Sequence, residues 1–298
     1  MSETIKIGTM VQVNEHSASY LKQILPYGFE SVAFTFGHDK EDMMDPEAFA
    51  EQVMPVLDAH GVTVGAIEAY GNPLLDTPKA EKLRQFLRRL AECAHLFRTD
   101  VIAGFTGRVP NCPVPDSIPK FKEVWTPICE YAGERKVRVA FENCTMGGTW
   151  GSGSWNIAFN PRGWELMFEA IPLDNIGLEW EPTHQMSQLI DPMPQLQQWG
   201  KKIFHLHGKD ANVRRDVIAK YGFNGPEAAV FHRHPGFGDC NWTHIISELR
   251  RVGFKGAIDI EGWHDPVYKG DLEMTGQVFA LDYLKRCRTT FVPNPTKD

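Results

Sequence analysis

The sequence predicts a single (β/α)8 barrel. Three observations favour this fold: short β-like runs recur eight times, helix-like stretches separate them, and no linker or low-complexity tract divides the 298 residues. A chain of this length with 42% hydrophobic residues can bury one large core, and α/β barrels often reach this size as one domain. We therefore expect one barrel domain over residues 1–298.

The expected strands are apolar runs bounded by turn residues. They span residues 4–13, 29–36, 62–70, 99–107, 137–143, 175–181, 202–207 and 256–262. Helical spacing of apolar residues predicts helices within 17–28, 45–61, 77–97 and 242–254. The second of these helices opens on an Asp-Pro start signal and closes on Gly61.

An open doubly wound sheet is the alternative arrangement of these elements. No G-x-G-x-x-G motif follows the first expected strand, which removes the main support for a dinucleotide-binding version of that fold.

The composition narrows the function classes. The formal net charge of −7 argues against a nucleic-acid or anionic-membrane binder, because such proteins usually carry a basic surface. No run approaches 18 apolar residues, and the first ten residues lack the pattern of a signal peptide. The six cysteines are scattered without a C-x-x-C pair. We expect a cytoplasmic protein with reduced thiols.

Four consecutive expected strands each end in a carboxylate or an imidazole. These residues are Glu142, Glu181, His207 and Glu261. In a barrel the strand ends meet at one mouth, so the side chains should converge there. Three carboxylates packed together repel one another, and a dication such as Mn²⁺, Mg²⁺, Co²⁺ or Zn²⁺ relieves that repulsion. The set therefore predicts a metal site, although any one glutamate alone is more typical of a helix cap or a solvated loop.

His205 lies two residues before His207, so strand alternation puts both on one face. We expect His205 one layer deeper in the barrel, as a satisfied core residue or as a side chain that orients the ligand.

Two long segments, 144–161 and 211–242, follow ligand-bearing strands and should lie at the substrate-binding face. Glycines around two tryptophans of the first segment suggest a mobile lid. Flat faces for a sugar ring or an aglycone are offered by Trp150, Trp155, Trp180 and Trp263.

An ordered set of motifs carries a family resemblance. The motifs are YGNPL at 70–74, FENC at 141–144, NIGLEWEPTH at 175–184, IDPM at 190–193, IFHLHGKD at 203–210, HPGFGDCNW at 234–242 and IDIEGWHDP at 258–266. The set resembles the xylose isomerase-like TIM barrel superfamily of sugar-phosphate isomerases and epimerases. This superfamily includes ketose 3-epimerases, inosose dehydratase and isomerase, and endonuclease IV. The match is dense from about residue 136 to 266.

The resemblance implies a TIM barrel that binds one divalent cation, for which we expect Mn²⁺, with Mg²⁺, Co²⁺ and Zn²⁺ as alternatives. The implied ligands are Glu142, Glu181, His207 and Glu261, and the implied catalytic residues are Glu142, Glu261 and His184. At position 181 the superfamily usually has the aspartate of a D-P-S-H-like motif, so the extra methylene of Glu181 is a departure that could change metal preference.

A metal flanked by two glutamates suits proton abstraction beside a carbonyl, with one glutamate removing the proton and the other returning it. We expect an isomerase or epimerase that acts on a keto-sugar or keto-glycoside through an enediolate. Elimination of a β-substituent from a keto-sugar, keto-glycoside or inosose, as in a lyase or dehydratase, is the alternative.

Residues expected to contact the substrate are Asn72, Lys209, Arg215 and Trp263. For Lys209 a structural ion pair with Asp210 or another acid is the alternative, and for Arg215 a solvated loop position. Segment 144–161 has no basic residue, and a phosphate needs cationic or backbone donors, so we expect a neutral substrate.

Two other functions stay open. One is a sugar-binding barrel without catalysis, which the presence of both glutamates disfavours. The other is a nuclease like endonuclease IV, which the net charge disfavours, as does the lack of an obvious histidine ligand at the early strand ends, where only His38 follows an expected strand. We expect a small sugar as the ligand, without nucleic acid or membrane, and a homo-oligomer. A hetero-oligomer with a small subunit is the alternative assembly.

Overall fold

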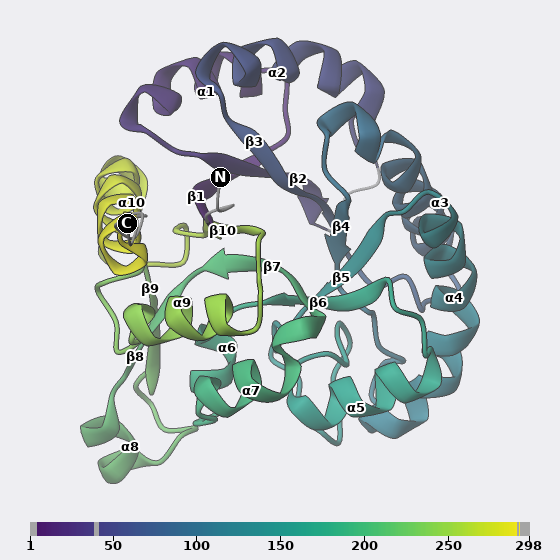
Figure 1. Ribbon diagram of the computed structural model, residues 1–298. Helices are drawn as coiled ribbons and strands as arrows, with labels where there is room; N and C mark the ends of the chain where they lie inside the picture. Colours follow the sequence, from purple (N-terminus) through teal and green to yellow (C-terminus); the bar gives the residue numbers. More distant parts are fainter. Residues whose placement is uncertain (1–4, 39–41, 291, 293–298) are drawn as a thin grey trace, which may run out of the picture.

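Eight parallel strands close into a barrel in the computed structural model of the protein, which describes residues 5–38, 42–290 and 292 (Figure 1). Around the barrel the order is β1, β10, β7, β6, β5, β4, β3 and β2. The bounds are β1 Lys6–Gln12, β2 Ser31–His38, β3 Thr63–Tyr70, β4 Val101–Gly104, β5 Arg138–Glu142, β6 Ile176–Trp180, β7 Ile203–Gly208 and β10 Ala257–Ile260. The predicted fold class is confirmed.

Helices surround the barrel and connect successive strands (Figure 1). The α-helices are α1 Ser17–Ile24, α2 Pro46–His60, α3 Pro78–Cys93, α4 Val114–Glu134, α5 Pro161–Ala170, α6 Thr183–Met186, α7 Pro192–Trp199, α8 Arg215–Tyr221, α9 Trp242–Arg251 and α10 Glu273–Arg288. Short 3₁₀ helices are η1 Leu25–Tyr27, η2 Ala94–Phe97, η3 Gly200–Lys202 and η4 Gly270–Leu272. None of the helices in the described part of the chain has the length and apolar character needed to cross a membrane.

The predicted strands agree with the observed ones to within a few residues, and Thr4 of the first lies outside the described residues. The end signals of α2 act as expected. The Asp45 side chain accepts a hydrogen bond from the N–H of Ala48, and Gly61 adopts a left-handed φ of 67° that ends the helix.

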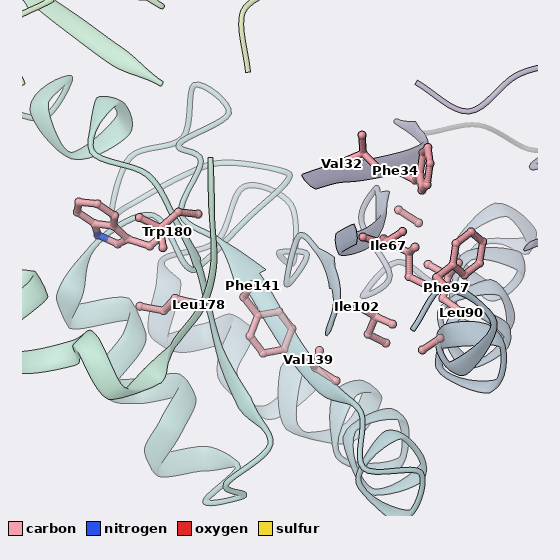
Figure 2. Close-up of a cluster of buried hydrophobic side chains, with 14 of the residues drawn as sticks. Val32, Phe34, Ile67, Leu90, Phe97, Ile102, Val139, Phe141, Leu178 and Trp180 are labelled. Atoms are coloured by element: carbon pink, nitrogen blue, oxygen red, sulfur yellow. The ribbon is translucent and has the colours of Figure 1, made fainter. Parts of the chain in front are cut away.

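The large apolar side chains lie between the barrel and the helices. Val32, Phe34 and Phe141 are among those drawn in Figure 2, and all three are fully buried. They project outward from their strands, so the residues at alternate positions face the barrel interior.

The barrel interior is filled differently from the bulky branched layers common in this fold. Small residues predominate in a separate cluster: Met10, Ala33, Ala66, Val101, Ala103, Ala140 and Phe204. Two glycines leave further space, because a Cβ at Gly8 or Gly65 would lie 2.1 and 2.3 Å from the carboxylate of Asp259. This space holds buried polar side chains below the barrel mouth.

A two-stranded antiparallel hairpin extends the loop after β7. It pairs β8 Asp210–Val213 with β9 Val230–Arg233, and α8 lies between them in sequence and projects from the barrel (Figure 1). Asp210 holds the hairpin base by accepting hydrogen bonds from the N–H groups of Gly236 and Cys240. The hairpin brings β9 to the rim of the barrel mouth.

Candidate active site and metal centre

A cavity of about 520 Å³ opens at the carboxyl ends of the barrel strands. The residues that line it are Met10, Gln12, Thr35, Tyr70, Phe105, Glu142, Cys144, Thr145, Met146, Gly147, His184, Ser187, His207, Lys209, His232, Glu261, Trp263 and His264. Of the four strand-end residues expected from the sequence, Glu142, His207 and Glu261 line the cavity, whereas Glu181 is buried outside its lining.

Three of the four predicted ligands form one compact group at the cavity floor. Nδ1 of His207 lies 3.4 Å from Oε1 of Glu142 and 3.4 Å from Oε2 of Glu261. One ligand atom from each residue falls within 4.8 Å of the other two, and all three side chains are buried. The group comes from β5, β7 and the residue after β10, so it joins strands that are far apart in the sequence.

The donor set of this group fits a divalent cation. Within the described residues, Nδ1 of His207 and Oε2 of Glu261 are buried without a hydrogen-bond partner. Unpaired buried polar atoms are costly, and a cation among them would satisfy both. Two carboxylates and one imidazole also match the ligands that Mn²⁺, Mg²⁺, Co²⁺ or Zn²⁺ takes in proteins.

Glu181 lies beside this group and is fully buried. Its carboxylate oxygens accept hydrogen bonds from the backbone N–H groups of Thr183 (2.8 Å) and His184 (2.9 Å) at the start of α6. Burial and the nearby glutamates raise the pKa of Glu181 to about 7. Each oxygen keeps a second lone pair, so these bonds do not exhaust its capacity as a ligand.

Lys209 sets the charge balance of the site. Its buried ammonium donates to Oε1 of Glu261 over 2.6 Å. Although burial alone would raise the pKa of Glu261, the ammonium outweighs it and holds that pKa well below its usual range. Among the described residues no lysine or arginine forms an ion pair with Glu142, and burial raises the pKa of Glu142. The two carboxylates on either side of His207 therefore differ in their affinity for a proton.

Three imidazoles line one side of the cavity. The ring of His184 packs edge-on against His232 of the hairpin, with centroids 5.0 Å apart, and His232 lies 6.0 Å from His264 in the same way. Burial and Lys209 lower the pKa of His232 to about 3, so the ring is neutral at physiological pH. The hairpin thus adds a neutral polar group to the pocket.

A second polar layer lies beneath the site, and the sequence analysis identified only His205 in it. His205 is fully buried, with Nδ1 2.7 Å from Oε1 of Glu179 and Nε2 2.8 Å from Oδ2 of Asp259. The expected position of His205, one layer deeper than His207, is confirmed. These hydrogen bonds raise the pKa of His205 to about 9 against the opposing effect of burial.

Glu179 and Glu68 are the functional candidates that sequence reasoning missed. Glu179 receives hydrogen bonds from His205 and from the Tyr70 hydroxyl (2.7 Å), and the histidines hold its pKa low despite burial. Glu68 receives one from Thr35 (2.8 Å), and burial together with Glu179 raises its pKa to about 7. The signal was present, because Glu179 precedes Glu181 by two residues and so shares its face of the strand.

Two predicted substrate contacts lie away from the cavity lining. The side-chain amide of Asn72 donates to the carbonyl oxygens of Arg108 (2.6 Å) and Ser154 (2.7 Å), so it fastens two loops together. Arg215 is exposed at the start of α8, in the solvated position that was its alternative. Lys209 and Trp263, in contrast, line the cavity.

The tryptophan prediction is mostly wrong. Of the four tryptophans predicted to face the substrate, Trp263 alone lines the cavity. Trp180 is fully buried on the outer face of β6, where its indole N–H donates to Gln195, because alternation turns it away from Glu179 and Glu181 (Figure 2). The loop with Trp150 is held by Arg108, whose guanidinium donates to the carbonyl oxygens of Thr149 and Trp150.

The comparisons with known proteins agree with the barrel fold. The model of the family described as xylose isomerase-like TIM barrel matches residues 21–287. The chain belongs to this family. Among curated proteins, a relative is the uncharacterized protein YfiH of Bacillus subtilis (strain 168), which is 21% identical over 246 residues, covering 74% of this chain and 78% of YfiH.

Solved structures share the fold of this chain at low sequence identity. The probable 3-DHS dehydratase AsbF from Bacillus anthracis is 16% identical, with a TM-score of 0.68 over 94% of this chain and 99% of that one. The D-psicose 3-epimerase from Clostridium cellulolyticum H10 is 12% identical, with a TM-score of 0.69 over 96% and 100%. At these identities the likeness establishes the barrel and not the reaction.

Proposed function

We propose that the protein is a divalent-metal-dependent isomerase or epimerase that acts on a keto-sugar or keto-glycoside through an enediolate. The observation that carries the proposal is the pair of buried carboxylates, Glu142 and Glu261, each 3.4 Å from Nδ1 of His207 at the floor of the mouth. Two carboxylates at a cation site suit the removal and return of a proton beside a carbonyl.

The proposed ligands of the cation are Glu142, His207 and Glu261, with Glu181 as the fourth. A divalent cation at this position would polarise the substrate carbonyl and stabilise the negative charge that develops on its oxygen.

The remaining steps of the proposed reaction are assigned to individual side chains. One of Glu142 and Glu261 removes the proton from the carbon next to the carbonyl, and the other returns a proton from a different side. Lys209 keeps Glu261 ionised, and His184 offers a hydrogen bond to a substrate oxygen. The Trp263 ring and the neighbouring loops exclude water from the enediolate.

The cavity favours a neutral substrate. Among the described lining residues Lys209 is the only lysine or arginine, and its ammonium is already paired with Glu261. A phosphate needs several cationic or backbone donors. A cavity of about 520 Å³ is also in the range of pockets that enclose small organic ligands.

Elimination of a substituent from the substrate is the second candidate reaction. The imidazoles that line one side of the cavity favour it. His232 and His264 lie on the same side of the cavity as Glu261, where they could donate to the oxygen of a departing substituent. Loss of that substituent from the enediolate would make the enzyme a lyase or dehydratase.

Solvent deuterium exchange read by NMR tests the proposal. The protein, supplied with Mn²⁺, is incubated in D₂O with ketohexoses, 3-keto-glycosides, inososes and ketose phosphates. The proposal predicts deuterium beside the carbonyl of a neutral substrate, with a new epimer or isomer; a released substituent would identify the lyase. Exchange only with phosphorylated substrates would contradict the neutral-substrate preference, and no exchange with any substrate would contradict enolisation.

A further inference from the structure

A chain of buried polar groups runs down the barrel axis beneath the candidate metal site. Nε2 of His207 lies 3.3 Å from Oε1 of Glu179, whose same oxygen contacts Nδ1 of His205 at 2.7 Å. Nε2 of His205 in turn lies 2.8 Å from Asp259. The proposed mechanism uses only the upper end of this chain, so the lower members need a separate explanation.

We propose that Glu179, with Glu68 beside it, is a positioning residue that keeps the proton of His207 on Nε2 and so presents the Nδ1 lone pair to the cation. This inference rests on the proposed function, because it concerns the ligand of the same cation site. It assigns a role to two carboxylates that do not touch the substrate cavity floor directly.

The surroundings of the His207 ring support this assignment. Glu142 and Glu261 face Nδ1, whereas Glu179 and Glu68 face Nε2 at 3.3 and 3.5 Å. An imidazole that binds a cation through one nitrogen carries its proton on the other. Nε2 of His207 is buried and has no hydrogen-bond partner among the described residues, and the two lower carboxylates are the acceptors that face it.

Glu179 is the better fixed of the two carboxylates. Its other oxygen accepts from the Tyr70 hydroxyl over 2.7 Å, and His205 clamps it from below. Both nitrogens of His205 face carboxylates, Nδ1 that of Glu179 and Nε2 that of Asp259, so the ring links the two side chains. In Glu68, Oε1 has no hydrogen-bond partner among the described residues, and Thr35 holds only Oε2.

The space for this chain is built into the barrel. A Cβ at Gly65 would lie 2.3 Å from Asp259 and 3.2 Å from Nε2 of His205. A Cβ at Gly8 would also collide with Asp259 and with Ser31, whose hydroxyl donates to that carboxylate. This row of buried polar side chains is thus fixed at its lower end by Asp259 as well as at its upper end by His207. A group that orients a metal ligand must itself be held in place.

The metal affinity of the Glu179→Gln variant tests the positioning role of Glu179 without a measurement of turnover. The amide keeps the shape and removes the charge. We expect the dissociation constant for Zn²⁺ or Mn²⁺, from competition with a chromophoric chelator, to rise by about 10- to 100-fold. Glu68→Gln should weaken binding less. Glu30→Gln, which removes a hydrogen-bonded carboxylate outside the site, is the matched control and should leave the affinity unchanged.

NMR of protein labelled with ¹⁵N-histidine gives a signature that a purely structural role would not change. In the Zn²⁺-loaded protein, Nε2–H of His207 should give a slowly exchanging downfield resonance, which Glu179→Gln shifts upfield and broadens. Glu179→Asp should restore part of both the affinity and the resonance.

The outcomes separate the two proposals. A native protein that binds no divalent cation would overturn the proposed function itself. A native protein that binds the cation, with unchanged affinity and an unchanged resonance in Glu179→Gln, would overturn only the positioning role. If Glu179→Gln fails to fold, Tyr70→Phe removes one hydrogen bond to Glu179 and should weaken binding several-fold; unchanged binding in both Tyr70→Phe and Glu68→Gln would then contradict the inference.

Discussion

At the scale of single residues, the site places several carboxylates close together and out of contact with water. Glu142, Glu181 and Glu261 are all buried near one another, and Lys209 is the only lysine or arginine in the described cavity lining. Buried carboxylates without enough partners are strongly destabilising. The proposed cation and proton-transfer site would account for this arrangement.

Replacing either proton-carrying carboxylate tests this explanation. Glu142→Gln and Glu261→Gln should each lower turnover by more than about 10³-fold, because each loses a metal ligand and a proton carrier together. Steady-state kinetics on the substrate found by deuterium exchange, with metal content measured in parallel, checks the prediction. A glutamine variant with near-native turnover would rule out the shuttle for that residue.

His184 should behave differently from the glutamates. His184→Ala is expected to keep the bound metal and lose most of its activity, because its ring lines the cavity while lying outside the group formed by Glu142, His207 and Glu261. Elemental analysis and turnover of the same preparation separate the two effects. Loss of metal in this variant would instead make His184 a ligand.

At the scale of elements, the strands were predictable and the direction of their side chains only partly so. Apolar runs and turn residues gave all eight barrel strands, but the helices at 114–134, 161–170 and 273–288 were not assigned. Prolines at positions 119 and 127 interrupt the helical signal of α4, although the helix tolerates them. Tertiary packing, absent from a local pattern, decides such cases.

The same limit applies to the site. Strand ends predicted Glu142, His207 and Glu261, because topology alone brings them together. The sequence could not predict that Asn72 joins two loops, since that depends on where the carbonyl oxygens of Arg108 and Ser154 lie. Strand alternation, which places His205 on the same face as His207, also places Glu179 on the face of Glu181 and Asp259 on that of Glu261.

Gly65 of β3 provides a test of the polar barrel interior. Gly65→Ala places a methyl group against Asp259 and should destabilise the fold by about 1–3 kcal/mol. Urea unfolding measures this change. The matched control is Gly151→Ala, since a Cβ there meets nothing within 4 Å of the described structure. Equal stability of both variants would contradict the tight packing around Asp259.

The ion pair between Glu30, which precedes β2, and Arg288 of α10 predicts that the stability of the fold depends on pH. Glu30 accepts hydrogen bonds from the guanidinium of Arg288 and the N–H of Ile7, and these outweigh burial and lower the pKa of Glu30. A carboxylate with a lowered folded-state pKa stabilises the fold above its unfolded pKa of about 4.3, and the contribution is lost as pH falls through the folded value.

Comparison with Glu30→Gln isolates this contribution. The native protein should be more stable than the variant near pH 7, and the difference should shrink as pH falls from about 5 towards 3. Denaturant unfolding of both proteins across this range measures it. A difference that is constant with pH would show that the carboxylate charge of Glu30 does not stabilise the fold.

At the scale of the whole molecule, the barrel brings distant parts of the sequence to one point. The proposed ligands lie at or just after the carboxyl ends of β5, β6, β7 and β10, so a bound cation would cross-link half of the barrel strands at the mouth. A ligand that binds only the folded state stabilises it by about 2.7 kcal/mol at a concentration of 100 dissociation constants. The site is therefore coupled to the fold as well as to the proposed reaction.

Anomalous diffraction from crystals grown with Mn²⁺ tests the central claim most directly. The account predicts one strong manganese peak at the barrel mouth, within about 2.0–2.4 Å of carboxylate oxygens of Glu142 and Glu261 and of Nδ1 of His207, and at the same distance from Glu181 if it is the fourth ligand. A manganese peak at a different group of residues, or no peak in a folded protein at saturating Mn²⁺, would contradict it.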